Sequence, residues 1–279
     1  MTIDYLKKLL QRYSIRPNKI LGQNFLMDEV AMEDMIDAAK VVKGDQVIEI
    51  GPGIGTLTQA LLDRGVTLLS IEKDPTFLPI LRKLAKEYPN FWYEIGDALK
   101  FDYRKAQTTQ PYKIIANIPY YITGKLIQTF LHLEPKPQSI TLLVQKEVAR
   151  NIAAKPPRMN LLGISVQILG EPEIAGQIPA RFFYPSPKVD SSVVHIEIPK
   201  KAPYTILDEK LFWRVLRACF SGKRKQIHNT LRNNLHLDPE VVSKILNQTG
   251  IDPATRPQSL SIRQWIVLVN AAKLYLTKN

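Results

Sequence analysis

The sequence predicts an α/β fold with a mostly parallel seven-stranded sheet, an antiparallel hairpin at one edge, and a small all-helical C-terminal domain. Two observations lead to this prediction. From about residue 46 to 198, short apolar runs alternate with segments of helical periodicity, which is typical of a parallel sheet covered by helices on both faces. After residue 205 the periodicity is helical to the end. We therefore expect two domains, residues 1–200 and 201–279.

The strands are expected where apolar, β-branched or aromatic residues form short runs. These runs are 46–51, 67–72, 91–96, 112–117, 139–145, 173–179 and 192–198. Helices are expected between the early strands, for example at 75–87 and 122–133, and the C-terminal helices at 208–220, 225–235, 239–248 and 261–276. The last two strands have no long helix between them, which indicates the antiparallel hairpin.

Composition limits the classes of function. The net charge is +12, and residues 201–279 carry 13 Lys/Arg against 5 Asp/Glu, which favours an anionic partner there, although a solubilising surface is the alternative. One cysteine, Cys219, excludes an internal disulfide, and the four histidines show no metal-ligand spacing, so we expect no metal. No apolar run reaches 18 residues and no secretion signal is evident, so we expect a cytoplasmic protein without a membrane span.

Three successive predicted strands end in residues suited to one ligand. The first ends in a glycine turn, G-x-G-x-G from Gly51, which allows a sharp bend and close approach of a ligand. Glu72 ends the second strand, where a carboxylate accepts hydrogen bonds from ribose hydroxyls. Asp97 follows the third and could accept from the exocyclic amine of an adenine. Each acid alone could instead cap a helix; together they predict a nucleoside site, because parallel strand ends meet at one edge.

The segment N-I-P-Y-Y at 117–121 ends the fourth strand and should face the same crevice. The Asn117 side-chain oxygen and the Ile118 carbonyl can each accept one hydrogen of an adenine N6 amine. Pro119 keeps Ile118 extended and offers no competing N–H. Tyr120 offers a face on which a base can stack. The pattern therefore predicts a site that makes an adenine nitrogen nucleophilic.

These motifs together resemble those of class I S-adenosylmethionine-dependent methyltransferases, which have a Rossmann-like fold. N-I-P-Y at 117–120 is similar to the motif of the ribosomal RNA adenine N6-dimethyltransferases of the KsgA/RsmA type. "ILGQNFL" (20–26), "FFYPSPKVDSSVV" (182–194) and "ACFSGKRKQIHNTL" (218–231) resemble further stretches of that family, and the resemblance covers about residues 16 to 277.

The resemblance implies a reaction and a set of residues. The enzyme would dimethylate two adjacent adenines near the 3′ end of 16S small-subunit ribosomal RNA during subunit biogenesis, as a monomer with S-adenosylmethionine as cofactor. Catalysis would use Asn117, Pro119, Tyr120 and Phe183, with Phe183 as a second stacking ring; a core position for Phe183 is the alternative. The residues implied for the cofactor are Asn24, Leu26, Gly51, Gly53, Glu72, Asp97, Ala98 and Asn117, and those expected to bind RNA are Arg16, Lys19, Lys223, Arg224 and Lys225.

Two other functions remain open at this point. The Erm methyltransferases use nearly the same core on one adenine of large-subunit ribosomal RNA. Mitochondrial transcription factor B relatives share the fold and bind nucleic acid as partners of a polymerase, so a non-catalytic binding or assembly role is a second alternative. The complete Asn117–Tyr120 motif favours an enzyme.

Overall fold

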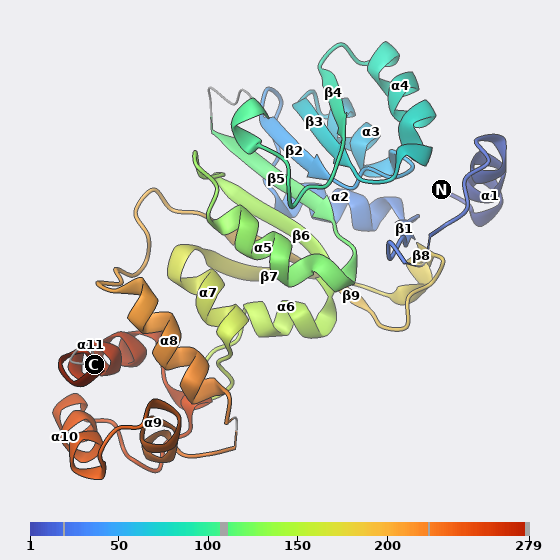
Figure 1. Cartoon of the computed structure of the whole chain (residues 1–279). Coiled ribbons are helices and arrows are strands. Elements are labelled where there is room, and N and C mark those ends of the chain that lie inside the picture. Colours follow the sequence, from blue (N-terminus) through green and yellow to red (C-terminus); the bar gives the residue numbers. More distant parts are fainter. Residues whose placement is uncertain (19, 107–110, 223, 277–279) are drawn as a thin grey trace. The chain divides into compact units, whose positions relative to one another are not determined.

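The structure is a computed structural model that describes residues 1–18, 20–106, 111–222 and 224–276 (Figure 1). Its contacts divide into two compact units, Met1–Arg150 with Gly170–Lys200, and Asn151–Leu169 with Lys201–Asn279. The chain thus changes unit at residue 200, where the sequence predicts a domain limit, but residues 151–169 group with the helical unit instead of the first domain. That each unit is a domain able to fold alone stays a prediction.

The first unit is built on a seven-stranded sheet with the order β4-β3-β2-β5-β6-β9-β7. Its strands are β2 (Gln46–Ile50), β3 (Thr67–Glu72), β4 (Phe91–Ile95), β5 (Tyr112–Asn117), β6 (Ser139–Gln145), β7 (Glu171–Ile178) and β9 (Ser191–Glu197). The first five in that order run parallel, whereas β9 is antiparallel to both β6 and β7. This confirms the predicted mostly parallel sheet with an antiparallel edge hairpin.

Helices cover both faces of this sheet. They are α2 (Glu29–Ala38), α3 (Thr56–Asp63), α4 (Leu78–Glu87) and α5 (Thr123–Leu131). Two more helices belong to this part of the chain: α1 (Ile3–Arg12) precedes the sheet, and α6 (Lys146–Ile152) reaches the limit of the unit. In Figure 1, α5 lies in front of the sheet and α2 behind it. The strand order reverses between β2 and β5, and ligands of such sheets bind at the carboxyl ends of the strands beside this point.

Helix α1 was not expected from the sequence. Thr2 caps its start by accepting a hydrogen bond from the Tyr5 amide at 3.3 Å. Leu6 and Leu10, four residues apart on one face, are 0% and 5% exposed and join the main core of the unit. The helix is therefore stabilised by burial of one apolar stripe, which is too short to separate from a polar N-terminal segment by periodicity alone.

The second unit is all-helical, as the sequence predicts. Its helices are α7 (Leu161–Leu169), α8 (Glu209–Phe220), α9 (Ile227–Leu235), α10 (Pro239–Thr249) and α11 (Ile262–Leu276). Asp208 and Asp238 cap α8 and α10 by accepting backbone N–H bonds. Phe212 and Trp265 lie in its core at 1% and 0% exposure. No helix of the described ranges is long and apolar enough to cross a membrane.

A carboxyl group is buried in β2, immediately before the glycine turn. Glu49 is 1% exposed, and its Oε2 accepts hydrogen bonds from the hydroxyls of Thr58 on α3 at 2.8 Å and Ser70 on β3 at 2.6 Å. Burial raises the pKa of Glu49 to about 7, more than the two hydroxyl bonds lower it. The Glu49 carboxyl thus connects β2 to α3 and β3 through hydrogen bonds. Its burial lowers the stability of the fold when the group is ionised.

Substitution of Glu49 by Gln should remove a pH dependence of stability. The unfolded chain ionises this group near its ordinary pKa of 4.5, whereas the folded chain does so at about 7, so stability falls as the pH rises through that window. Between pH 5 and 8 the free energy of unfolding of the wild type should drop by roughly 2–3 kcal/mol relative to Glu49→Gln. Urea denaturation at both pH values measures it; parallel pH profiles would contradict a buried, titrating Glu49.

Candidate active site

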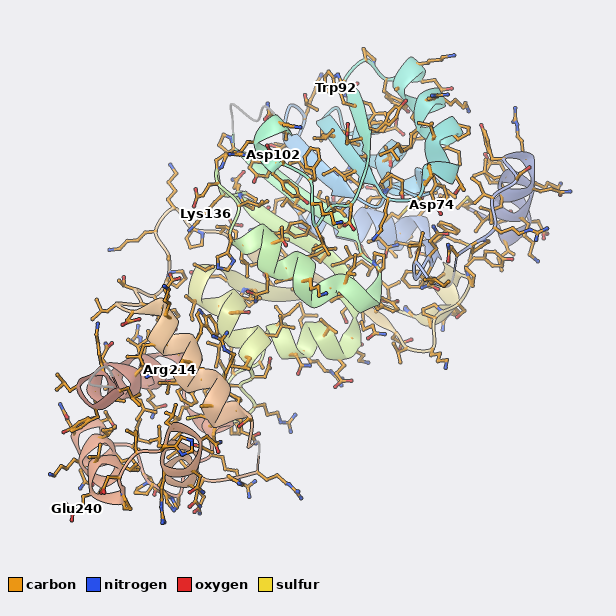
Figure 2. All side chains as sticks on the ribbon, in the orientation of Figure 1. Asp74, Trp92, Asp102, Lys136, Arg214 and Glu240 are labelled. Carbon is orange, nitrogen blue, oxygen red and sulfur yellow. The ribbon has the colours of Figure 1, made fainter. Side chains whose placement is uncertain are left out.

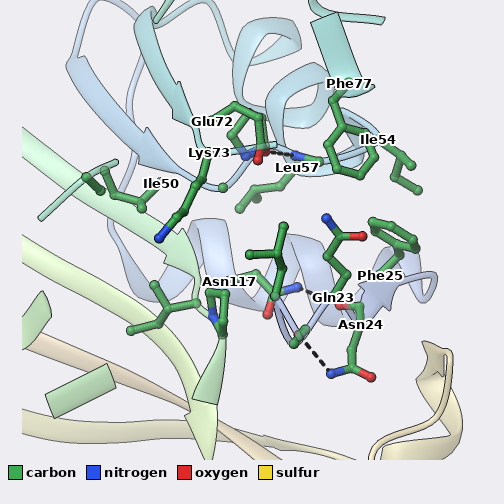
Figure 3. A pocket seen from close by; sticks show the side chains of 18 of the residues that line it. Gln23, Asn24, Phe25, Ile50, Ile54, Leu57, Glu72, Lys73, Phe77 and Asn117 are labelled. Atoms are coloured by element: carbon green, nitrogen blue, oxygen red, sulfur yellow. Dashed lines mark hydrogen bonds between the residues drawn. The ribbon is translucent and has the colours of Figure 1, made fainter. Parts of the chain in front are cut away.

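A cavity lies at the carboxyl ends of β2, β3, β4 and β5 (Figure 3). The residues predicted to bind the cofactor all line it, together with Pro119 and Tyr120 of the predicted catalytic set. They are Asn24, Leu26, Gly51, Gly53, Glu72, Asp97, Ala98 and Asn117. Segments far apart in the sequence therefore meet in one place, as the convergence of parallel strand ends requires.

The turn after β2 depends on glycine for its backbone conformation. Gly51 and Gly53 have φ of 72° and 54°, in the left-handed region that residues with a Cβ rarely adopt. A Cβ on Gly53 would also lie 3.3 Å from a ring carbon of Phe25, a tighter contact than side chains normally make. The turn consequently keeps its backbone exposed to the cavity at two positions.

Glu72, at the end of β3, is held by two backbone amides. Its Oε2 accepts from the Gly53 N–H at 2.9 Å, and its Oε1 accepts from the Asp74 N–H at 2.7 Å. The side chain is buried at 5% exposure, and burial raises the pKa of Glu72, although these amide bonds oppose the rise. Each carboxylate oxygen keeps a further lone pair that can accept from a ligand hydroxyl in the cavity.

Asp97, which follows β4, is engaged by a cation that the sequence analysis did not single out. Its Oδ2 pairs with the Lys73 ammonium at 2.9 Å, and its Oδ1 accepts from the Leu99 N–H at 3.0 Å. The Lys73 ammonium holds the pKa of Asp97 below its usual value, so the group stays an ionised acceptor. Lys73 also lines the cavity, where Figure 3 shows its side chain.

Asn117 ends β5 with its amide oriented by the N-terminal segment. Its Nδ2 donates to the Asn24 carbonyl at 3.3 Å, which leaves the Oδ1 as an acceptor in the half-buried mouth of the cavity. Pro119 has φ −57° and ψ 132°, an extended conformation that directs the chain from the strand into the short helix η3 (Tyr120–Ile122). The predicted sequence of acceptor, proline and aromatic ring therefore lies at one rim.

Residues 21–26 form a strap across the cavity, held at both ends. The two-residue strand β1 (Phe25–Leu26) pairs antiparallel with β8 (Phe183–Tyr184). Further along the strap, the Gln23 Nε2 donates to the Asp74 Oδ2 at 2.7 Å. Sequence reasoning missed Gln23 and the β1–β8 pair, because contacts between such distant segments leave no local pattern.

The structure corrects the placement of Phe183. We expected its ring to face a bound base, but it is 2% exposed, belongs to the main core and does not line the cavity. The alternation of a strand explains this, since β8 turns Phe183 inward while it pairs with Leu26. Of the two predicted stacking rings, the cavity receives Tyr120 alone.

The structure describes three of the five basic residues predicted to bind RNA. Arg16, Arg224 and Lys225 are exposed, whereas Lys19 and Lys223 lie outside the described residues. Helix α9 begins at Ile227, so Arg224 and Lys225 lie in the turn before it rather than on its first turn. Figure 2 shows that side chains of both charge signs cover this unit, with Arg214 and Glu240 labelled. Among the residues that the structure describes, no group of three or more His, Cys, Asp or Glu could hold a metal.

Known proteins resemble this chain over most of its length. The profile of the family described as "Ribosomal RNA adenine dimethylase" matches residues 15–273. The chain is 38% identical to "Ribosomal RNA small subunit methyltransferase A" of Dehalococcoides mccartyi (strain CBDB1) over 260 residues, 93% of this chain and 89% of the relative. It is also 38% identical to the protein of that name from Clostridium botulinum (strain Langeland), over 93% of this chain and 95% of the relative.

Two solved structures share the fold. The 23S rRNA methyltransferase ErmE is 25% identical with a TM-score of 0.72, covering 90% of this chain and 100% of ErmE. A dimethyladenosine transferase from Plasmodium falciparum is 24% identical with a TM-score of 0.76, covering 90% and 98% of the two chains. Because the first unit holds 150 and 31 residues in its two segments, a coverage of 90% of the chain extends in both cases into the helical unit.

Substitution of Phe183 by Ala should destabilise the fold. Removing a fully buried aromatic side chain typically costs about 3–5 kcal/mol, so the free energy of unfolding should fall by that amount. Phe182→Ala is the matched control, because Phe182 is only half-buried beside the Arg181 guanidinium, and its loss should be smaller. Denaturant titration of both variants measures this. A Phe183→Ala variant as stable as the wild type would contradict the buried position of Phe183.

Proposed function

This chain belongs to the ribosomal RNA adenine dimethylase family, and we propose from this premise that it dimethylates adenines of small-subunit ribosomal RNA at N6 with S-adenosylmethionine. Its target would be two adjacent adenines near the 3′ end of the 16S RNA. The observation that carries the proposal is the placement of Asn117 and Tyr120 at the rim of the cavity that contains Glu72 and Asp97. A base acceptor and a nucleoside site are thus adjacent.

The donor set of the cavity fits S-adenosylmethionine. The two Glu72 oxygens, each already bonded to one amide, would accept the ribose hydroxyls with their second lone pairs. Asp97 with the neighbouring Ala98 would hold the adenine ring. The glycine turn at Gly51 and Gly53 would accommodate the methionine part, with Asn24 and Leu26 of the strap covering it. When bound, this cofactor supplies a methyl group on a positively charged sulfur.

The residues at the rim would prepare the adenine for attack. The Asn117 Oδ1 and the Ile118 carbonyl would accept the two N6 hydrogens, so that the nitrogen lone pair would be directed out of the ring plane and available for attack on a methyl donor. Tyr120 supports one face of the base by stacking, worth about 1–3 kcal/mol per base. The second methylation has one N–H fewer to hold the base, so stacking then contributes a larger share. The N6 proton leaves to water, and no protein base is required.

The helical unit would hold the RNA around its target. Arg224 and Lys225 are exposed before α9, and Lys223 extends this run. Arg16, exposed between α1 and the strap, would bind phosphate on the first unit, with Lys19 in the same segment of the sequence. We place the activity in the cytoplasm, where bacterial small subunits are assembled. We expect no metal, because a methyl group on a sulfonium is already activated. We also expect the protein to act as a monomer.

The site of methylation can be located directly. Small and large ribosomal subunits that lack N6-dimethyladenine would be incubated with the protein and methyl-labelled S-adenosylmethionine. Nuclease digestion and mass spectrometry then map the label. The proposal expects two labelled adjacent adenines near the 3′ end of the small-subunit RNA. Label confined to the large subunit would support the Erm-type alternative, and no label in either would support a non-catalytic binding role.

Asn117→Ala should reduce the rate of methylation far more than the affinity for RNA. The acceptor acts on the nitrogen as it becomes a nucleophile, so its contribution belongs to the transition state. Loss of one such preorganised polar group typically lowers kcat by a factor of about 100 or more. Single-turnover rates at saturating RNA and cofactor measure this, with the melting temperature as the folding control. Normal turnover by the variant would remove Asn117 from the mechanism.

Neutralising Arg224 and Lys225 together should make RNA binding less dependent on salt. Two phosphate contacts contribute a slope of about 2 in a plot of log K against log salt concentration, and this amount should be lost. Binding to unrelated RNA should weaken similarly, since phosphate contacts position and do not specify. The control removes two exposed charges from α4, Arg82→Ala with Lys86→Ala. Equal slopes in the two double variants would move the RNA surface elsewhere.

A further inference from the structure

The hydroxyl of Tyr120 has a partner on a distant strand. Its oxygen lies 2.8 Å from the Oγ of Ser191, which is 71 residues further along the chain. Tyr120 is half-buried and lines the cavity, whereas Ser191 is 0% exposed and does not. A buried polar side chain is therefore directed at the outer end of the ring on which the base is proposed to stack.

Ser191 is a fixed point of the sheet. It is the first residue of β9 and pairs with Gln145 of β6 on one side and Ile178 of β7 on the other. The preceding residue, Asp190, is held as well: its carbonyl accepts from the Lys146 N–H at 3.0 Å and its carboxylate from the Ala180 N–H at 3.0 Å. The Ser191 hydroxyl consequently has little freedom to follow a moving partner.

Tyr120 is constrained from the opposite end by its backbone. It begins η3 directly after Pro119, and the Pro119 carbonyl accepts from the Ile122 N–H at 3.2 Å. Burial raises the pKa of the Tyr120 phenol, so the hydroxyl keeps its proton and can donate to Ser191. The side chain is thus fixed at its Cα by the turn and at its hydroxyl by the strand, and these two fixed ends define the direction of the long axis of the ring.

We infer that Ser191 is a positioning residue that sets the long axis of the Tyr120 ring, and through it the position of the target adenine relative to Asn117. This inference rests on the proposed function. Since Phe183 lies in the core, Tyr120 alone of the two predicted rings lines the cavity and can support the base there. Without the Ser191 hydroxyl, the Tyr120 hydroxyl would be half-buried without its partner, and the ring would turn to reach water.

Loss of the Ser191 hydroxyl should lower the rate of methylation without weakening cofactor binding. Glu72, proposed to hold the ribose of the cofactor, is bonded to Gly53 and Asp74 and not to Ser191. A turned ring would tilt the base, so the N6 lone pair would no longer point at the methyl group. The second methylation, in which the base has lost one N–H, should suffer more than the first. N6-monomethyladenine should therefore accumulate when the hydroxyl pair is broken.

A double-mutant cycle tests the inference. Ser191→Ala and Tyr120→Phe each remove one partner, and the double variant removes both. Each single variant should lower kcat at saturating cofactor and RNA by about three- to tenfold, the range expected for one hydrogen bond, with monomethyladenine accumulating. The double variant should be no slower than the slower single variant. Cofactor affinity by calorimetry and the melting temperature should stay close to those of the wild type.

Ser192→Ala is the matched control. Ser192 is 1% exposed and is the next residue of the same strand, with its side chain on the opposite face of the sheet. It should keep the wild-type rate and product ratio. Four results would overturn the inference: an unchanged rate for Ser191→Ala, additive losses in the double variant, equal losses in Ser192→Ala, or a loss that accompanies weaker cofactor binding. If the wild type itself methylates no RNA, the proposed function fails instead.

Discussion

The site depends on one buried carboxylate that two backbone amides hold in place. Glu72 accepts from the amides of Gly53 and Asp74, and these bonds join the turn after β2 to the residues that follow β3. Burial disfavours the ionised group, so it is retained at a cost that the amide bonds offset only in part. A buried carboxylate that is costly to ionise is a candidate for a functional role, and the role proposed for Glu72 is to bind the hydroxyls of a ligand.

The other parts of the cavity follow from this constraint. The fixed turn needs glycine at Gly51 and Gly53, and Glu49 supports it from behind through the hydroxyls of α3 and β3. Asp74, beside Glu72, accepts from Gln23 and so attaches one end of the strap. The strap in turn presents the Asn24 carbonyl that orients the Asn117 amide. The same short segment therefore connects Glu72, the proposed cofactor ligand, with Asn117, the proposed base acceptor.

Local patterns predicted the sheet and the strand-end residues because each is encoded within a few positions. Alternation of apolar runs and helical periodicity was sufficient for the seven strands, and turn chemistry for the glycine loop. The failures concern contacts between distant segments. The Lys73–Asp97 ion pair and the β1–β8 pairing have no local signal, and the pairing decides that Phe183 points into the core. Residues 151–169 group with the helical unit for the same reason, since packing determines their place.

The central claim is that the Glu72 carboxylate binds the ribose hydroxyls of the cofactor, and calorimetry tests it most directly. S-adenosylhomocysteine and its 2′-deoxy analogue would be titrated into the wild type and into Glu72→Gln. A hydrogen bond to a charged group contributes about 1.5–3 kcal/mol, so the wild type should bind the deoxy analogue at least about tenfold more weakly. Glu72→Gln should bind both ligands weakly and lose most of this discrimination. Equal discrimination by the two proteins would contradict the account.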